Sequence, residues 1–403
     1  MTTVLARHTT APVRQASSLA HVGLADLEEL PVLRTASFSS STKAALFDGL
    51  LRSAEDAADR LAAKAPRDPE AALIHLLTRN RFLKGSRSNA PATDRHITQA
   101  IAAGEPIPLA LRGFPFKQCD NGLKASGPLP DLAEAGALIR LAELAGAYRQ
   151  LYSPGVHITL LADGGYYRPR PASDLSIYRQ ALEDLITGLH LQNTVTIVDQ
   201  AAALKTASPE RWSQRASLIE RLHRQIAQTI RYCDAASATN RLNSLAAVPF
   251  DALFRSMIYS VPVPGGSDPA WTTAVLSDIY TTTGPLGEAR REVLRRAWQD
   301  TTQYTAVATA DHQLQLFDTL PYLRLASGAP RPGAFGFSYL GGSLLPWHGT
   351  GFIDERHRVG VDFAVTLRAA GYVALGTDQP FAYVAPSLVE ETLRTDLIRL
   401  KSR

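Results

Sequence analysis

The sequence predicts an α/β protein in which a Rossmann-like parallel sheet is flanked by helices and followed by a smaller C-terminal subdomain of mixed α+β structure. Three short apolar segments, 107–111, 156–161 and 194–198, alternate with helical patterns at 131–151 and 175–189. This alternation is typical of a parallel sheet with crossover helices. Ligands of such sheets bind beyond the carboxyl ends of the strands, so we expect the chemistry to lie there.

The remaining elements divide the chain into three predicted parts. Residues 1–38 are rich in Ser, Thr and Ala with weak periodicity, and we expect a mobile N-terminal arm. Residues 39–320 form the predicted α/β catalytic core with helical additions, and residues 321–403 a smaller mixed subdomain that covers the site. Apolar spacing predicts further helices at 41–61, 70–83, 93–103, 209–233 and 288–316, and strands at 322–326, 334–340, 360–367 and 382–384.

Composition narrows the class of protein. The 403 residues carry 42 Lys and Arg against 38 Asp and Glu, a balance too even to indicate a nucleic-acid partner. No apolar run is long enough for a membrane span, and the N-terminus lacks the apolar core of a signal peptide. Cys119 and Cys233 are too few for a disulfide scaffold and have no metal-type spacing. We therefore expect a cytoplasmic protein with no membrane partner and no metal site.

A segment dense in Gly and Pro, residues 113–134, connects the first predicted strand to the helix that begins near Asp131. Such a composition excludes a helix interior or a central strand, so a long ordered loop is predicted. The loop carries Lys117 and Lys124. Either lysine could be an ordinary surface residue. A desolvated Lys117 could instead bind phosphate, act as a general base or form an imine, and Lys124 could neutralise a phosphate.

Three carboxylates near this loop also have two interpretations. Asp131 and Glu134 have the spacing of a capping box, and beyond that structural role they could orient the lysines or a substrate amine. Asp163 follows a buried strand and precedes two glycines, which allow a ligand to approach the backbone closely. A catalytic role is the favoured interpretation of Asp163.

Several motifs resemble the pyoverdine/dityrosine biosynthesis family, the isocyanide (isonitrile) synthases. They are Phe114-Pro-Phe-Lys117, Asn121-Gly-Leu-Lys124, Leu129-Pro-Asp-Leu-Ala-Glu134, the block from Tyr152 to Gly164, Tyr322–Leu325 and Leu345-Pro-Trp-His348. The resemblance covers roughly residues 70 to 375 and is most specific between residues 113 and 167.

The resemblance implies that the α-amine of an L-amino acid, tyrosine or tryptophan in characterised relatives, becomes an isocyanide whose carbon comes from C2 of ribulose 5-phosphate. It implies no cofactor, amino acid and sugar-phosphate substrates, and a downstream oxygenase or tailoring enzyme as a possible partner. Lys117, Asp163 and His348 are then the expected catalytic residues. The expected substrate- and phosphate-binding residues are Lys124, Arg324, Phe116, Trp347, Asp131 and Glu134.

The sequence departs from the family at one position and leaves other classes open. The segment from Arg324 lacks the His that the family usually carries shortly after this Arg. A diverged, non-catalytic small-molecule-binding paralogue is therefore one alternative, and another α/β transferase such as a methyltransferase is a second. The absence of G-x-G-x-x-G, Walker, His-Glu-x-x-His and G-x-S-x-G motifs disfavours dinucleotide oxidoreductases, P-loop NTPases, zincins and α/β-hydrolases.

Overall fold

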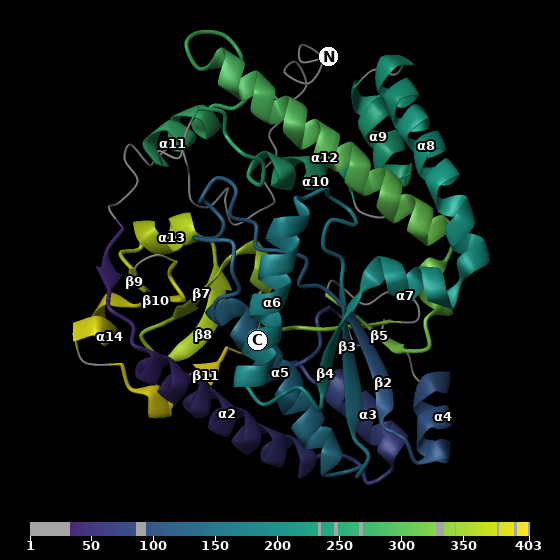
Figure 1. Cartoon of the computed structure of the whole chain (residues 1–403), viewed down its shortest axis with the longest axis vertical. Coiled ribbons are helices and arrows are strands. Elements are labelled where there is room, and N and C mark those ends of the chain that lie inside the picture. Colours follow the sequence, from purple (N-terminus) through teal and green to yellow (C-terminus); the bar gives the residue numbers. More distant parts are fainter. Residues whose placement is uncertain are drawn as a thin grey trace.

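The computed structural model contains two β-sheets and a layer of helices (Figure 1). It describes residues 33–85, 94–232, 235–245, 249–265, 269–327, 334–342, 344–376, 379–390 and 393–401. The predicted N-terminal arm lies outside these residues up to residue 32. Its last part does not form an arm, because β1 (Thr35–Ala36) pairs with a strand of the second sheet.

The first sheet is wholly parallel and confirms the predicted fold class. Its five strands have the order β4-β3-β2-β5-β6. The strands are β2 (Ile107–Arg112), β3 (Val156–Ala162), β4 (Val195–Asp199), β5 (Leu323–Ala326) and β6 (Ala334–Gly336). The predicted boundary at residue 321 falls inside this layer, because β5 and β6 complete the same sheet as β2.

Both faces of the parallel sheet are buried. Leu109, Leu111 and Ile158 are fully buried in the main core on one face. Ala110 and Leu161 point to the other face and pack in a second cluster with residues of α7 (Gln200–Ala207) and η4 (Leu316–Thr319). Burial on both faces explains why these strands are continuous apolar runs in the sequence.

The second sheet is mixed and contains six strands in the order β1-β9-β10-β7-β8-β11. They are β1, β9 (Val373–Leu375), β10 (Ala382–Val384), β7 (Thr350–Ile353), β8 (Arg358–Asp362) and β11 (Arg399–Leu400). The predicted strand at 360–367 is wrong in its second half. The strand ends at Asp362, and α13 (Ala364–Ala369) begins because the amides of Ala364 and Val365 donate to the carbonyls of Lys124 and Leu123.

Helix α5 (Leu132–Arg149) lies between the two sheets and contacts β3 on one side and β7 and β8 on the other. It is buried around nearly its whole circumference, as expected for a helix without a polar face. Four further helices pack around these elements: α2 (Ser40–Ala62) along α5, α3 (Pro69–Leu77) against α4 and α5, α4 (Arg95–Ala103) against β2, and α6 (Ala172–Gly188) against α5.

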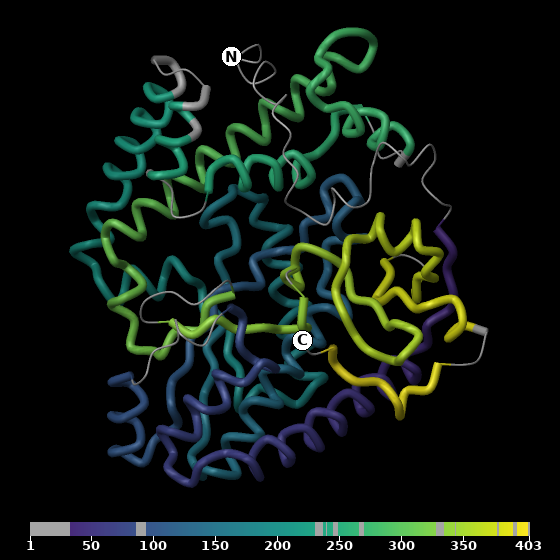
Figure 2. Tube along the Cα trace, turned by 180° about the vertical axis from the view of Figure 1, so that it is seen from behind, coloured from purple at the N-terminus to yellow at the C-terminus, as the bar shows by residue number. Residues whose placement is uncertain are grey.

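A helical layer covers the end of the parallel sheet at which the strands finish (Figures 1 and 2). It consists of α8 (Pro209–Tyr232), α9 (Ala235–Leu245), α10 (Phe250–Ile258), α11 (Pro269–Ser277) and α12 (Gly287–Gln313). The elements η5 (Pro346–His348), α14 (Pro386–Glu390) and η6 (Thr395–Leu397) belong to the C-terminal part. The loop after β2 therefore has the helical layer above it and the second sheet beside it.

Candidate active site

The predicted loop between β2 and α5 is ordered by aromatic packing at its start. Phe114 is buried against Trp347, with the ring centroids 5.1 Å apart, and against Tyr339 at 6.2 Å. A Cβ on Gly113 would lie 2.3 Å from the Trp347 ring, so only glycine allows this approach. Trp347, which we expected to bind substrate, is itself buried and supports the loop.

Lys117 forms a buried cluster with the two carboxylates that begin α5. Its ammonium donates to Glu134 Oε2 at 2.5 Å and to the Pro346 carbonyl at 3.0 Å, and it lies 3.0 Å from Asp131 Oδ1. Only 3% of Lys117 is exposed. The lysine is therefore a desolvated cation held between two carboxylates.

The predicted capping box of Asp131 and Glu134 is present, and these carboxylates do more than cap the helix. Asp131 also accepts hydrogen bonds from Thr350 Oγ1 at 2.5 Å and from the Gly351 amide at 3.1 Å, which ties α5 to β7. Glu134 Oε1 accepts from the Tyr178 hydroxyl at 3.2 Å. Burial raises the pKa of Glu134 above its usual range, against the attraction of Lys117.

Lys124 is buried in a second cluster, among oxygens of α10 and its C-terminal turn. Its ammonium donates to Ser260 Oγ at 2.5 Å, to the Ser256 carbonyl at 3.0 Å and to Gln118 Oε1 at 3.4 Å. Burial, together with the nearby charge of Arg168, lowers the pKa of Lys124 to about 7. The Lys124 ammonium has no carboxylate among these contacts.

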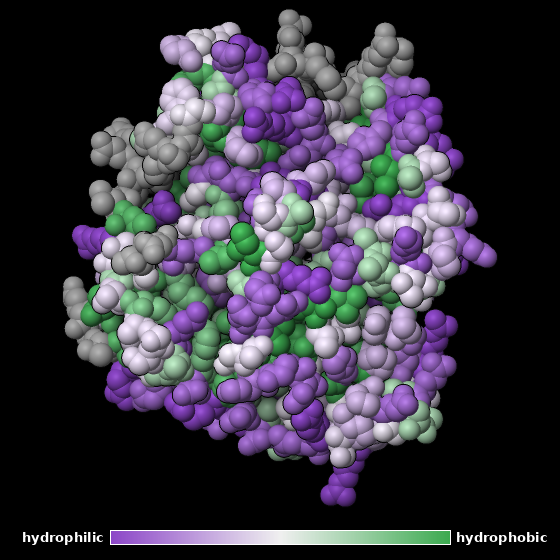
Figure 3. Space-filling view, in the orientation of Figure 1, coloured by the Kyte–Doolittle hydropathy of each residue, from purple (hydrophilic) through white to green (hydrophobic). Residues whose placement is uncertain are grey.

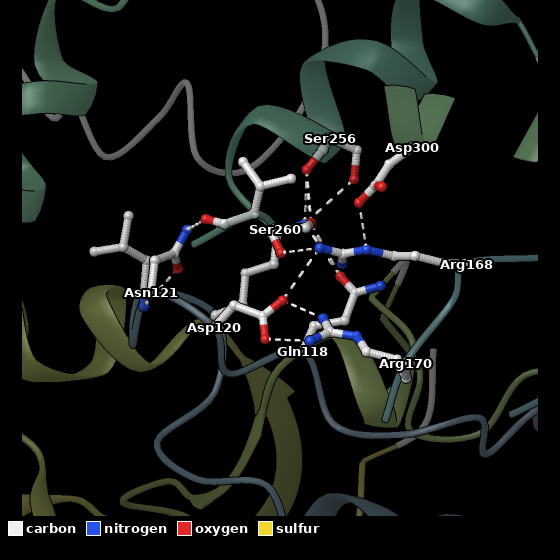
Figure 4. A network of polar contacts seen from close by, with 11 residues as sticks. Gln118, Asp120, Asn121, Arg168, Arg170, Ser256, Ser260 and Asp300 are labelled. Carbon is white, nitrogen blue, oxygen red and sulfur yellow. Dashed lines mark hydrogen bonds and ion pairs between the residues drawn. The ribbon is translucent and has the colours of Figure 1, made fainter. Parts of the chain in front are cut away.

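Two arginines from the segment after β3 complete this second cluster, as Figure 4 shows. Asp120 lies between Arg168 and Arg170, and Arg168 Nε pairs with Asp300 of α12 at 2.5 Å. Arg168 Nη2 also donates to the Ser260 carbonyl at 2.8 Å. Among the described residues, Arg168 Nη1 and Arg170 Nε are buried without a hydrogen-bond partner. When Lys124 carries its proton, three cations and two carboxylates leave this cluster with a surplus of positive charge.

Asp163 lies directly beyond the carboxyl end of β3. Its Oδ1 is buried and, within the part of the chain that the structure describes, accepts no hydrogen bond. Burial raises the pKa of Asp163 to about 7, and the charge of Arg112 opposes this rise. The charge of Asp163 also contributes to raising the pKa of Tyr178, whose hydroxyl donates to Glu134.

His348 is close enough to Lys117 and Lys124 for their positive charges to lower its pKa. Burial lowers its pKa to about 3, with further contributions from Lys124, Lys84 and Lys117. His348 is therefore neutral near pH 7. The structure thus brings Lys117, Lys124, Asp131, Glu134 and His348 into one region, and Asp163 follows β3, the strand that pairs with β2.

Phe116 and Arg324, two further predicted site residues, do not contact Lys117 or Lys124 through any of the bonds described above. Phe116 lies beneath Arg170, whose guanidinium carbon is 4.6 Å from the ring centroid. Arg324 lies opposite Ala110 in the strand register, before the end of β2, and pairs with Asp318 at 2.7 Å. A role of Arg324 in substrate binding stays a prediction.

A cavity of 160 Å³ lies at the carboxyl ends of β3 and β4. The loop residues Phe114 and Pro115 form one wall, and residues of α6 form another. Gly164 and Gly165, which follow Asp163, line the cavity between them. An opening of this kind is where a ligand of a parallel sheet is expected.

Sequence reasoning missed several polar residues of this region. Tyr178 occupied an apolar position in a helical pattern, and nothing in that pattern singled it out. Arg168 and Arg170 could have been found, because two arginines that follow a strand end are a signal for an anion. Ser256 and Ser260 come from a segment without clear periodicity. Their contacts with Lys124 therefore could not be predicted before the structure was known.

The described residues contain no group of three His, Cys, Asp or Glu side chains with the arrangement of a metal site. No helix in the described ranges combines the length and low polarity that a membrane crossing requires.

Residues 97–248 match the family model described as pyoverdine/dityrosine biosynthesis protein. This part of the chain, 152 of the 403 residues, resembles that family. The matched residues include most of the predicted site, namely Lys117, Lys124, Asp131, Glu134 and Asp163.

Two curated relatives are named for isocyanide formation. Isocyanide synthase A of Aspergillus fumigatus is 34% identical over 107 residues, 25% of this chain and 18% of that protein. The L-tryptophan isonitrile synthase of Fischerella ambigua is 33% identical over 97 residues, 23% of this chain and 30% of that protein. The aligned part of the chain thus spans less than a third of either relative.

A solved structure supports the same fold over a longer range. The PvcA protein from Pseudomonas aeruginosa aligns with 78% of this chain and 100% of its own, at a TM-score of 0.51 and 20% identity. At this identity the likeness shows the fold and not the activity.

Proposed function

We propose that the protein is an isonitrile synthase that converts the α-amine of an L-amino acid to an isocyanide, with ribulose 5-phosphate as the carbon source. One observation carries the proposal: the segment that matches the family holds a set of buried ionisable groups at the carboxyl ends of β2 and β3. Desolvated groups with shifted pKa values are characteristic of catalytic sites.

The first step that we propose is attack of the neutral amine on the C2 carbonyl of the sugar phosphate. This step needs a base that can accept a proton from the amine near neutral pH. Asp163 is suited to this role, since its pKa of about 7 is far above that of an exposed carboxylate. Its unpartnered Oδ1 is the atom that we assign to the proton.

We assign the phosphate group to Lys124, Arg168 and Arg170. The surplus positive charge and the unpartnered guanidinium nitrogens of this cluster suit a dianion. A phosphate would also favour the charged form of Lys124, whose pKa burial has lowered to about 7.

Lys117 is assigned to the remaining proton transfers, and His348 to a hydrogen bond with the substrate. Lys117 can polarise a developing oxyanion or donate a proton, with Asp131 and Glu134 holding its ammonium in place. His348, whose pKa burial lowers to about 3, is too weak a base to accept a proton near pH 7, and its neutral ring can instead form a hydrogen bond with the substrate. Release of C2 requires both of its carbon–carbon bonds to break, together with loss of phosphate. The reaction proposed here is not a redox reaction and calls for no cofactor.

The test is turnover. Purified protein is incubated with ribulose 5-phosphate and a panel of L-amino acids, and isonitrile products are detected by mass spectrometry. We expect an isonitrile from at least one aromatic amino acid. Binding of these substrates without product would support the non-catalytic paralogue, whereas methyl transfer from S-adenosylmethionine to an acceptor would support the methyltransferase. Asp163→Asn serves as the inactive control in every assay.

A further inference from the structure

A second cavity, of 530 Å³, lies between the C-terminal end of α2 and the turn that follows α3. We call it the Arg79 cavity. Its volume is within the range of about 300–1,000 Å³ that is typical of ligand sites. Its lining is mostly cationic, with Arg60, Lys64, Arg79 and Arg81, and the described residues that line it include no carboxylate. This distribution of charge favours an anion.

The end of α2 forms one wall of the Arg79 cavity. Ala57, Arg60, Leu61 and Lys64 recur at intervals of three and four residues, so they lie on one side of the helix and its last turn. Ala57 is buried and Leu61 is half-buried, whereas Arg60 and Lys64 are exposed. Figure 3 shows hydrophilic side chains along the lower edge of the molecule, where α2 runs in Figure 1. The wall thus has a small apolar base and a charged rim that is open to solvent.

The turn after α3 forms the opposite wall and is fixed by the core. The amide of Phe82, whose side chain is fully buried, donates to the Arg79 carbonyl at 2.9 Å and closes the turn. Arg81 Nη2 donates to Glu143 Oε2 of α5 at 2.8 Å. The same carboxylate pairs with Arg140 at 2.8 Å, so one buried acid is shared by two arginines. The two arginines of this turn are therefore held in place before any ligand binds, which lowers the entropic cost of binding.

The other three cations of the cavity are not neutralised by the described part of the chain. Arg79 Nε is buried and has no hydrogen-bond partner among the described residues. Within the same residues, no ion pair involves Arg60, Lys64 or Arg79. Asp59 precedes Arg60 in the sequence, but it accepts from Gln150 Nε2 at 2.7 Å and does not line the cavity. Because a buried guanidinium nitrogen without an acceptor is unfavourable, an anion that pairs with Arg79 would stabilise the fold.

We propose that the Arg79 cavity binds a small anion that carries phosphate groups. Phosphate oxygens match the forked donors of a guanidinium, and a phosphate ester has nearly twice the negative charge of a carboxylate near pH 7. The site is separate from the groups around Lys117. Glu143, which fixes Arg81, lies about 14 Å further along α5 than Glu134, at 1.5 Å a residue. The inference therefore does not depend on the proposed function.

The experiment follows the Nε–H signal of Arg79 by NMR in the full chain, with pyrophosphate as the probe. The signal is identified by its absence in Arg79→Gln. We expect a saturable shift of this signal in the parent. The double variant Arg60→Gln/Lys64→Gln removes two exposed cations of the rim and should weaken binding by about tenfold. Arg52→Gln is the matched control, because Arg52 is an exposed cation of α2 that does not line the cavity, and it should leave the affinity unchanged.

Two further probes test the chemical class of the ligand. Citrate carries carboxylates in place of phosphates, and an oligoglutamate peptide represents an acidic segment of a partner protein. Pyrophosphate should bind more tightly than either probe. An Arg79 signal that does not shift at low salt overturns the site, and so does an equal loss of affinity in Arg52→Gln and the double variant, which would indicate general attraction between charges. Citrate or the peptide binding as tightly as pyrophosphate overturns the assignment to a phosphate-bearing anion.

Discussion

Asp163 is distinguished from Asp131 and Glu134 by what its carboxylate contacts. Asp131 and Glu134 each accept several hydrogen bonds and pair with Lys117. Asp163 Oδ1 is buried and has no hydrogen-bond partner among the described residues. The paired carboxylates of Asp131 and Glu134 are explained by their roles at the start of α5. A buried carboxylate oxygen without a partner destabilises the fold, so the free Oδ1 of Asp163 indicates a function.

We predict that Asp163→Asn lowers kcat by about a hundredfold or more without lowering stability. The amide keeps the size of the side chain but cannot accept the proton of the amine. In the parent, kcat/KM should rise with pH through about 7 as Asp163 loses its proton, and the variant should lack this limb. Asp174→Asn, an exposed acid in the first turn of α6, is the control and should leave kcat unchanged.

The raised pKa of Asp163 should also make the stability of the folded protein depend on pH. Because the folded state holds the Asp163 proton up to pH 7, the parent should lose stability relative to Asp163→Asn as pH rises from about 4 to 7. If Asp163→Asn instead unfolds much more easily while each folded molecule keeps full turnover, the carboxylate is structural.

Lys124 allows an independent test through the pH dependence of stability. Its pKa falls from 10.5 in the unfolded chain to about 7 in the folded protein, so above pH 7 the unfolded state binds the additional proton. The free energy of unfolding of the parent should therefore rise relative to Lys124→Met, on the order of 1 kcal/mol per pH unit between about pH 7 and 10. Denaturant titrations at pH 7, 8 and 9 measure this difference. A difference that is constant with pH would mean that Lys124 stays charged in the folded state.

At the scale of elements, the N-terminus of α5 connects the two sheets. Asp131 accepts from the Ala133 amide of the helix at 2.7 Å and from Thr350 and Gly351 of β7. The sequence predicted the capping box, because its spacing is local. The bonds to β7 and the pairing with Lys117 depend on how distant segments meet, and no local pattern encodes them.

We predict that Asp131→Ala destabilises the protein by about 3 kcal/mol or more. The loss combines a helix cap, worth about 1 kcal/mol, with buried donors left unsatisfied at about 1–3 kcal/mol each. Asp68→Ala is the matched control, since Asp68 caps α3 at an exposed position with one bond to the Ala71 amide. It should cost only about 1 kcal/mol in chemical denaturation. Equal losses in the two variants would show that the contacts between α5 and β7 contribute little.

Lys117, an expected catalytic residue, also has a structural role, because it pairs with both Asp131 and Glu134. Lys117→Ala would leave two buried carboxylates without their cation, which costs about 3–5 kcal/mol. Lost activity in that variant would therefore not separate catalysis from folding. This ambiguity is the reason that Asp163→Asn, and not a Lys117 variant, serves as the control for turnover.

At the scale of the molecule, the parallel sheet was predictable and the covering layers were only partly so. The strands β2, β3 and β4 were recognisable as apolar runs between helical patterns, although β4, at the edge of the sheet, is mostly half-buried. The change from strand to helix after Asp362 was not, because a short apolar run has no period that separates the two. The contacts that α10 and α12 make with Lys124 and Arg168 join segments far apart in the sequence, and only the folded chain reveals them.

The residues around Lys117 and Lys124 come from segments far apart in the sequence, so a ligand that binds them should stabilise the whole fold. The loop after β2, the segment after β3, the helical layer and the second sheet each contribute residues around Lys117 and Lys124. The phosphate assigned to the Lys124 cluster would contact both the loop after β2 and the segment after β3. Binding of ribulose 5-phosphate should accordingly stabilise the folded chain as a whole.

Carbon transfer tests the proposed activity most directly. Ribulose 5-phosphate labelled with 13C at C2 is incubated with the protein and L-tyrosine, and the product is examined by 13C NMR and mass spectrometry. We predict that the label appears in the terminal isonitrile carbon, and that Asp163→Asn yields no labelled product. Unlabelled isonitrile would contradict the carbon source, and the absence of isonitrile from every amino acid tested with folded protein would contradict the activity itself.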